Sequence, residues 1–188
     1  EWSDQGVEGA FRFLGRFWRI MLHYAQFMPA EENGEYAPEQ LEKEAKELRR
    51  ALHGTIKKVT EDVEQRFNFN TAISSIMELV NAMYALKEEP KAQVSGLAQE
   101  LVSSSLRLIA PFAPHMAEEL WQLIGGNGSV HKQSWPVYDD AALQVEEVEL
   151  VLQINGKVRD KIVAPVGLNA AELETLAMGQ ERVQQAIG

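Results

Sequence analysis

The stretch Leu108-Ile-Ala-Pro-Phe-Ala-Pro-His-Met-Ala-Glu-Glu-Leu-Trp121 decides the fold, because it joins the end of one helix to the start of another. Pro111 and Pro114 interrupt the first helix, since proline lacks a backbone N–H and disfavours helical geometry in the residue before it. Apolar residues at helical spacing resume after Pro114. Glu118 and Glu119 lie near the start of this new helix, where acidic side chains favour the positive end of the helix dipole. The stretch predicts a helical protein whose elements are separated by prolines.

Four further helices are expected before this stretch, because apolar residues recur there every three or four positions. The expected helices cover residues 4–28, 38–66, 71–87 and 91–110, and the fifth covers 115–124. Gly125-Gly-Asn-Gly128 ends the fifth helix. The sequence therefore predicts a mainly α fold, with a five-helix bundle over residues 1–125 and a linker loop over 126–145.

The apolar period changes from 3.6 to 2 beyond the linker, which is typical of strands. Segments 149–154 and 157–163 flank Asn155-Gly156. Asn-Gly is the preferred turn of a two-residue hairpin, since both central residues need positive φ. Residues 170–178 and 180–187 are expected to be two short helices. A lone hairpin is marginally stable in water, so we expect 146–188 to be a small, truncated α+β unit with one strand face against these helices.

The composition is that of a folded protein. The chain has 188 residues, of which 45% are hydrophobic, and it has no cysteine, so no disulfide can form. No apolar run approaches the roughly 20 residues needed to cross a bilayer, and no signal peptide is apparent. The first residue is Glu1, and we therefore expect a piece excised from a longer protein.

The net charge of −10 disfavours nucleic acid as a partner, but the distribution of charge matters more than the total. Residues 1–66 hold 13 acids and 10 bases, whereas residues 112–146 hold 5 acids and 1 base. In the first helix a row of cations at positions i, i+4, i+7 and i+11 falls within about 60° of the circumference. This first cationic row consists of Arg12, Arg16, Arg19 and His23. Apolar residues, Phe11 among them, fill most of the remaining circumference, so the helix is expected to be buried apart from this row.

The second helix repeats the spacing with a second cationic row, Lys46, Arg50, His53 and Lys57, and Arg49 lies beside it. We expect this second row to face outward or sideways, about 120° from the apolar face. In the hairpin, Lys157, Arg159 and Lys161 are expected on one side of a strand and Asp160 on the other.

Two interpretations of these cations stay open. Charged rows are common on solvated helix surfaces, and Glu42–Lys46 and Glu39–Lys43 have the i,i+4 spacing of ion pairs. Lys157–Lys161 would then be a charged edge strand that resists aggregation. Alternatively, both rows and the hairpin bind an RNA backbone, where each cation neutralises a phosphate and releases a counterion. The candidate tRNA-binding residues are Arg12, Arg16, Arg19, Arg49, Arg50, His53, Lys57, Lys157, Arg159 and Lys161.

No catalytic constellation is apparent. His23, His53, His115 and His131 are scattered and lack the spacing of metal ligands, so no metal site is expected. The serines at 103–105 lie inside an expected helix and lack the sharp strand-to-helix turn that exposes a nucleophile. No glycine-rich phosphate loop occurs. We therefore expect no catalytic residue in this chain.

Several motifs resemble the leucyl-tRNA synthetase family of class I aminoacyl-tRNA synthetases. The order of Leu108–Trp121, Ser129-Val-His-Lys-Gln-Ser-Trp-Pro136 and Gln153-Ile-Asn-Gly-Lys-Val-Arg159 is similar to the C-terminal third of its bacterial members. Leu52–Val63 and Phe67–Ile73 are similar to the second and third bundle helices of the family. Asn155-Gly-Lys-Val-Arg159 is the most specific of these motifs for the leucine enzymes.

The resemblance implies an anticodon-binding-type helical bundle followed by the start of a small C-terminal domain. It implies that the parent enzyme, a monomer in the cytoplasm, ligates leucine to its tRNA with ATP and Mg. Those cofactors belong to a catalytic domain whose signatures this chain lacks, so the fragment itself is expected to be non-catalytic. Its partners would be leucine tRNA and the catalytic domain in cis, with no membrane. The alternative is a helical bundle that binds proteins and has no affinity for RNA.

Overall fold

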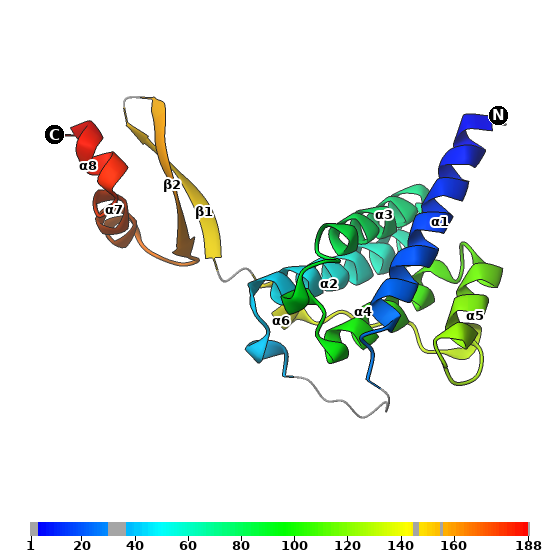
Figure 1. The fold of residues 1–188 in the computed structure, drawn as a ribbon. Helices are drawn as coiled ribbons and strands as arrows, with labels where there is room; N and C mark the ends of the chain where they lie inside the picture. The colour runs from blue at the N-terminus through cyan, green and yellow to red at the C-terminus, as the bar shows by residue number, and fades with distance from the viewer. Residues whose placement is uncertain (1–3, 30–36, 145–146, 155, 188) are drawn as a thin grey trace. The chain divides into compact units, whose positions relative to one another are not determined.

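The elements of the chain fall into two units, Glu1–Leu143 and Gln144–Gly188. The computed structural model describes residues 4–29, 37–144, 147–154 and 156–187. The first unit contains the five expected helices, and the second contains the hairpin and two short helices (Figure 1). The mainly α fold class is confirmed. Among the described residues, every helix is too short or too polar to cross a membrane.

The five long helices form where the sequence predicts them, with small shifts at their ends. They are α1 Asp4–Ala25, α2 Lys43–Glu64, α3 Phe69–Ala85, α4 Ser95–Ile109 and α5 Pro114–Leu123. Two expected helices begin later than predicted, because Pro38 and Pro90 each open a separate 3-10 turn, η1 Pro38–Gln40 and η2 Pro90–Ala92. The backbone becomes extended at Leu41 and Val94, after each turn, before the α-helix starts.

Gly125 and Gly126 end α5 for two different reasons. Gly125 has φ +81°, a left-handed conformation that glycine adopts without steric cost. Gly126 donates its N–H to the carbonyl of Trp121 over 2.8 Å. A Cβ at Gly126 would lie 2.4 Å from the indole of Trp121, so only glycine fits there.

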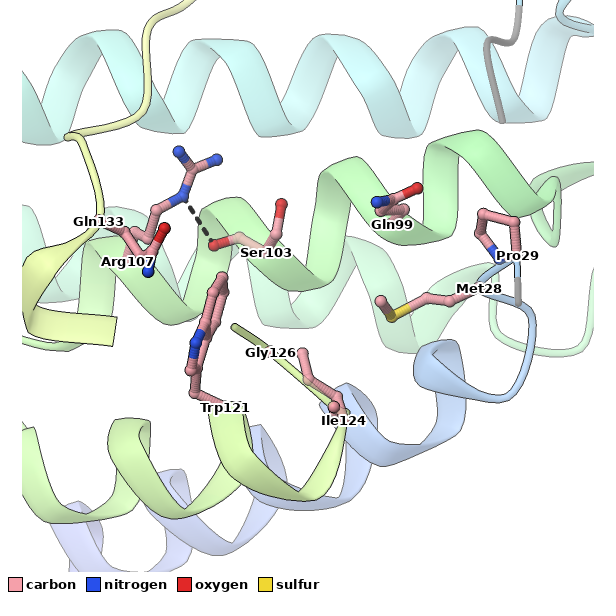
Figure 2. A pocket seen from close by; sticks show the side chains of 10 residues that line it. Met28, Pro29, Gln99, Ser103, Arg107, Trp121, Ile124, Gly126 and Gln133 are labelled. Carbon is pink, nitrogen blue, oxygen red and sulfur yellow. Dashed lines mark hydrogen bonds between the residues drawn. The ribbon is translucent and has the colours of Figure 1, made fainter. Parts of the chain in front are cut away.

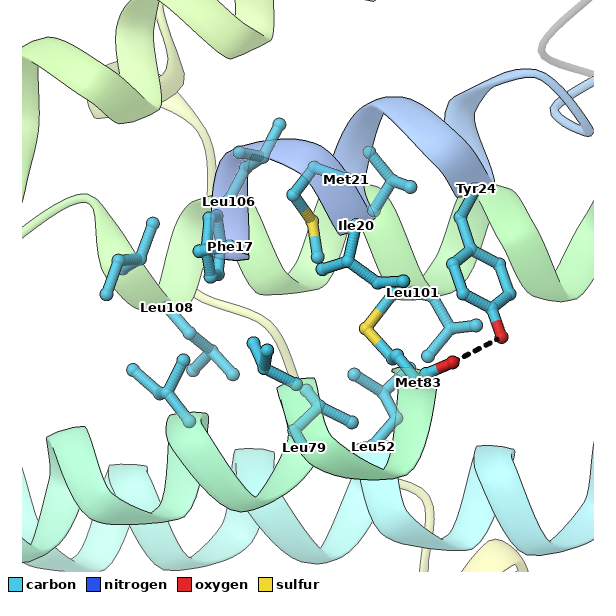
Figure 3. Packing of buried hydrophobic residues seen from close by; sticks show 14 of the residues in the cluster. Phe17, Ile20, Met21, Tyr24, Leu52, Leu79, Met83, Leu101, Leu106 and Leu108 are labelled. Atoms are coloured by element: carbon cyan, nitrogen blue, oxygen red, sulfur yellow. Dashed lines mark hydrogen bonds between the residues drawn. The ribbon is translucent and has the colours of Figure 1, made fainter. Parts of the chain in front are cut away.

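The core of the first unit lies between α1, α2, α3 and α4 (Figure 3). Its fully buried side chains include Phe17, Ile20, Met21, Tyr24, Leu52, Leu79, Met83, Leu101, Leu106 and Leu108. Each such apolar side chain contributes about 1.5–3 kcal/mol when it is buried. The Tyr24 hydroxyl donates to the carbonyl of Met83 over 3.2 Å, and burial raises the pKa of Tyr24 to about 12. The core therefore accepts this polar group only as a neutral, hydrogen-bonded phenol.

Residues 126–143 pack on the bundle, so the predicted linker at 126–145 is wrong over this part; residues 145 and 146 lie outside the described residues. This arm contains η3 Val130–Lys132 and α6 Asp140–Leu143. Val130 is buried at the centre of η3. The indole N–H of Trp135 donates to the hydroxyl of Thr60 on α2 over 2.8 Å. The arm therefore belongs to the first unit.

The second unit contains the expected antiparallel hairpin of β1 Glu147–Ile154 and β2 Lys157–Pro165. Gly156 has φ +74°, as a tight turn of the Asn-Gly kind requires, while Asn155 lies outside the described residues. Ile162 and Ala164 are buried on one strand face, and Val183 of the last helix is buried as well. The short helices are α7 Ala170–Met178, capped by Asn169 and Glu172, and α8 Glu181–Ile187.

The hairpin contains one bulge that the sequence did not predict. Leu152 pairs with Asp160 and Gln153 with Val158, so Arg159 is left as an extra residue on β2. An inserted residue reverses the alternation of side chains beyond it. The side chains of β2 that precede Arg159 therefore lie on the faces opposite to those that regular alternation from Asp160 onward would give them.

Candidate nucleic-acid interface

The first cationic row lies on α1, and its three arginines, Arg12, Arg16 and Arg19, are called the α1 row below. Arg12 and Arg19 are exposed, and Arg16 between them is half-buried. The three lie on one side of α1 because its apolar side faces the core. Exposed arginines on one face of a helix are the arrangement that binds a phosphate backbone.

Arg16 is held in place from α3. Its Nη2 donates to Oδ1 of Asn81 over 2.8 Å, and its guanidinium carbon lies 4.9 Å from the ring centre of Tyr84. The Tyr84 hydroxyl in turn donates to the backbone carbonyl of Arg16 over 3.1 Å. A guanidinium fixed by a ring and an amide loses less conformational entropy when it binds an anion. Arg16 is therefore a preorganised cation.

Two other residues of α1 differ from the prediction. His23 lies with Nε2 2.8 Å from the carbonyl of Lys87, and its ring contacts Tyr24 and Phe27 edge-on. It therefore joins the ends of two helices and does not extend the open row. Phe11 was expected to help bury the helix, but it is 77% exposed because the first turns of α1 extend beyond the other helices (Figure 1).

The second cationic row, Lys46, Arg50, His53 and Lys57, lies on α2 and is called the α2 row below. It does not project as a whole, because the arm covers its flank. His53 of this row and Arg49 beside it are buried, so the outward or sideways orientation expected for the row does not leave these two residues open. Arg49 donates from Nε to Glu100 over 3.2 Å and from Nη2 to Asp139 over 2.9 Å. The pairs satisfy a cation that would otherwise be buried without a counterion.

His53 completes this network in its neutral form. The backbone N–H of Asp139 donates to Nδ1 over 3.1 Å, so Nδ1 is an acceptor and carries no proton. Nε2 therefore carries the proton and donates to Glu100 over 2.9 Å. The bond from Arg49 lowers the pKa of Asp139, and a bond from the backbone N–H of Ala141 adds to the effect. The network joins α2, α4 and the arm.

The remaining cations of α2 are more accessible than Arg49 and His53. Lys57 places its ammonium 5.1 Å from the ring centre of Tyr138 in the arm, a cation–π contact. Lys46 and Arg50 are half-buried on the helix. The arm thus runs along α2 past Thr60, Lys57 and His53, and it occupies much of the surface that the prediction gave to RNA.

The hairpin cations are exposed but do not share one face. Lys161 lies opposite Val151 and Lys157 opposite Ile154. Val151 and Ile154 are three residues apart on β1, so their side chains are on opposite faces. The prediction that Lys157, Arg159 and Lys161 line one side is wrong, because the bulge at Arg159 reverses the alternation. Asp160 is half-buried and pairs with Arg182 at 3.5 Å.

A groove of about 640 Å³ lies beside the α1 row, between α1 and α3. Small residues of α1 form one wall, and Met77 and Asn81 form the other. Arg12 and Arg16 both line it. The groove is mostly apolar with a cationic border, so it could receive a flat, anionic or phosphorylated group.

A second pocket, of about 310 Å³, lies between α4, α5 and the end of α1 (Figure 2). Figure 2 shows Trp121 and Met28 lining it, with Gln99 and Ser103 on the α4 side. Arg107 is held by the carbonyls of Ser103 at 3.1 Å and Ser134 at 3.2 Å, and burial lowers the pKa of Arg107. The described residues that line this second pocket include neither a carboxylate nor a histidine, so they provide no acid–base pair.

In the part of the chain that the structure describes, no three His, Cys, Asp or Glu side chains come together as metal ligands would. His115 and His131 are both exposed, and His131 contacts the carbonyl of Pro114 at 3.3 Å. The chemistry that the described side chains support is binding by arginine, amide and aromatic groups.

The sequence reasoning missed Asn81 and Tyr84, which fix Arg16. Both residues lie in the helix expected over 71–87, and neither is among the candidate residues named from the sequence. A polar amide one turn before a tyrosine on a largely apolar helix was the available signal. It could not be connected to Arg16 without knowing that α1 and α3 lie side by side.

The comparisons of this chain with known proteins all give tRNA ligases. The sequence matches the family described as "Anticodon-binding domain of tRNA ligase" over residues 45–174. It is 45% identical over 184 residues to a leucine–tRNA ligase of Geobacter sp. (strain M21), covering 98% of this chain and 22% of that protein. A leucine–tRNA ligase of Symbiobacterium thermophilum is 40% identical over 215 residues, covering 100% of this chain and 25% of that protein. The chain thus spans about a quarter of the length of these curated relatives.

A solved structure is similar over the whole chain. It is the crystal structure of the ternary complex of Agrobacterium radiobacter K84 agnB2 LeuRS–tRNA–LeuAMS, with a TM-score of 0.73 and 32% sequence identity. The similarity covers 100% of this chain and 24% of that one.

Proposed function

Because the chain belongs to the family of tRNA-ligase anticodon-binding domains, we propose that its helical unit docks leucine tRNA for a longer leucine–tRNA ligase. In that protein, another domain would bind ATP and Mg and ligate leucine. The present unit would hold the tRNA so that its acceptor end reaches that domain, which is a positioning contribution to catalysis. The fragment alone would not activate leucine, and leucine-dependent pyrophosphate exchange by this chain would contradict that assignment.

The observation that carries the proposal is the α1 row of Arg12, Arg16 and Arg19. Arg12 and Arg19 are exposed, and Arg16 is fixed between Tyr84 and Asn81. The net charge of −10 opposes RNA, but exposed charges more than about 10 Å apart are largely screened at 0.1 M salt. A local row can therefore attract phosphates on an acidic protein. Such contacts would depend on the shape and backbone of the tRNA more than on its bases.

The test is the salt dependence of tRNA binding, measured by fluorescence anisotropy with a leucine tRNA transcript. The unchanged chain should bind weakly, and its affinity should fall steeply as salt rises. Changing Arg12 and Arg19 together to Ala removes two phosphate contacts, so affinity should fall about tenfold or more and the log–log salt slope should become shallower by about 1–2.

The matched control changes Lys43 and Lys132 to Ala, because both lysines are exposed and the variant reaches the same net charge. An equal loss in this control would mean that overall charge, and not the α1 row, governs binding. Binding that is absent, or that is insensitive to salt, would favour a helical bundle that contacts proteins instead.

We also propose that the longer protein acts in the cytoplasm and that this chain is a monomer. The resemblance to leucine–tRNA ligases supports both statements. Light scattering on the purified chain would test the second, and a mass of twice the monomer value would contradict it.

A further inference from the structure

We propose that the groove between α1 and α3 binds one unpaired nucleotide of the docked RNA, with the base inserted between the two helices. The proposal rests on the proposed function and assigns a specific role to one part of the same surface. The groove lies directly beside the α1 row, since Arg12 and Arg16 form part of its wall. A nucleotide in the groove would therefore be continuous with the backbone held by the row.

The shape of the groove comes from small residues on α1. Gly6, Gly9 and Ala10 lie across from Met77 and Asn81 of α3. A Cβ built on Gly9 would meet no atom within 4 Å, so the space in front of this glycine is open. The volume of about 640 Å³ is within the range of roughly 300–1,000 Å³ found for small-ligand sites.

The chemistry of the walls fits a base and its phosphate together. Phe13 and Met77 provide apolar surface for a flat ring. Arg16 is fixed against Tyr84, and guanidinium planes stack on unpaired bases in RNA complexes. Arg12, exposed on the same wall, would neutralise the phosphate. A base within an RNA duplex is already stacked and paired, so the nucleotide that enters the groove must be unpaired.

Asn81 adds a group that can contact the edge of a base. Its Oδ1 accepts from Arg16, which orients the amide. Among the described residues, none is recorded as accepting from its NH2 group, which has two donor hydrogens. Glu8 and Glu78 are exposed on the same two helices and would repel phosphates placed beyond the groove. These two carboxylates restrict the favourable position of a phosphate to the stretch between Arg12 and Arg16.

The decisive variant is Gly9→Leu, which fills the groove without changing charge. A filled groove cannot receive the stacked base, so tRNA affinity should fall about tenfold while the salt slope stays the same. Binding of a fully paired RNA duplex should not change, because a duplex offers no base to insert. Both measurements use the whole chain and the same anisotropy assay.

Two controls make the result interpretable. Val7→Leu adds apolar bulk at an exposed position outside the groove lining and should keep full affinity. Circular dichroism reports whether Gly9→Leu folds; should it not fold, Asn81→Ala tests the same groove and should weaken tRNA binding about threefold or more.

Unchanged tRNA affinity in folded Gly9→Leu, or in Asn81→Ala, would overturn the groove assignment while leaving the α1 row intact. An equal loss for tRNA and duplex would also overturn it, since no base insertion would then be involved. If the unchanged chain shows no salt-dependent tRNA binding, the proposed function fails, and the groove assignment fails with it.

Discussion

At the residue scale, Arg12 and Arg49 show that the same side chain on similar helices can have opposite environments. Both come from cationic groups flanking the apolar side of an amphipathic helix. Arg12 is exposed, whereas Arg49 is buried and paired with Glu100 and Asp139. Removing one partner of a buried pair leaves the other charge uncompensated, and this is the main energetic consequence of such pairs. Arg49 is therefore a stabilising residue of the bundle.

Asp139→Asn should destabilise the chain at neutral pH and make its free energy of unfolding less dependent on pH in the acidic range. The bond from Arg49 holds the pKa of Asp139 below its usual range in the folded state. A lowered folded pKa means that the carboxylate stabilises the fold fully above its unfolded pKa, near 4. This stabilisation is lost as the pH falls through the folded pKa. Urea unfolding at several pH values should show a deficit of about 1 kcal/mol at pH 7, because the carboxylate is partly exposed.

The deficit should shrink below about pH 4, where Asp139 becomes protonated in the unfolded state and then in the folded state of the unchanged chain. Asp140→Asn is the control, since Asp140 is adjacent and exposed, and it should shift the free energy of unfolding by no more than about 0.5 kcal/mol. A deficit for Asp139→Asn that stays constant down to pH 2 would mean that the ionised carboxylate is not what stabilises the arm.

The burial of Arg49 and His53 could not be predicted from the sequence. The helical spacing gives the angle of a side chain around its own helix, and that was sufficient to predict the α1 row. It does not say what packs on each side. The flank of α2 is covered by residues 75–90 positions further along the chain, as in the contacts of Arg49 with Asp139 and of Thr60 with Trp135.

At the element scale, the hairpin shows both the reach and the limit of local patterns. Asn155-Gly156 and the alternation of apolar residues were sufficient to predict two strands and their turn. The bulge at Arg159 has no comparable signal, because an extra residue changes no side-chain type. It nevertheless changes the surface of the hairpin, since it places Lys157 and Lys161 on opposite faces. A partner that contacts one face of the hairpin therefore meets only one of these two lysines.

The turn between α2 and α3 contains local strain that a substitution should relieve. Phe67 has φ +51°, a left-handed conformation that costs non-glycine residues about 1–2 kcal/mol, and its side chain is 73% exposed. Phe67→Gly should therefore remove the strain while losing little packing. Part of the gain is offset by the greater freedom of glycine in the unfolded chain. We expect a net gain of about 0.5 kcal/mol, measured as a higher midpoint in urea unfolding.

Phe67→Ala is the matched control, because it removes the ring but keeps the Cβ that causes the strain. It should show no gain in stability. If Phe67→Gly destabilises the chain as much as Phe67→Ala does, then the exposed ring contributes packing that outweighs the backbone strain.

At the scale of the whole molecule, the order of the helices was predictable and the extent of the first unit was not. Apolar spacing predicts the helices, and prolines and glycines separate them. Residues 126–143 lack such spacing and contain glycine, proline and polar residues, which are typical of a loop. These residues are joined to the bundle by individual contacts. Val130 lies in the core, Trp135 contacts Thr60, and Asp139 contacts Arg49 and His53.

Truncation distinguishes the predicted boundary from the observed one. A chain ending at residue 143 keeps the arm, whereas a chain ending at 125 loses it and leaves Arg49 and Glu100 without Asp139. The shorter chain also exposes the apolar surface that Val130 covers. Since burial of Val130 alone contributes about 1.5–3 kcal/mol, the shorter chain should unfold at a much lower urea concentration.

The comparison uses two chains that both lack the second unit, so the difference between them reports the arm alone. Asp139→Asn in the chain ending at 143 should reproduce only part of the loss, because Val130 and Trp135 remain. Equal midpoints for the two truncated chains would show that packing of the arm on the bundle contributes no net stability. Such an arm would leave the flank of α2 readily, so the cations there would be accessible to RNA and the α2 row would return as a candidate.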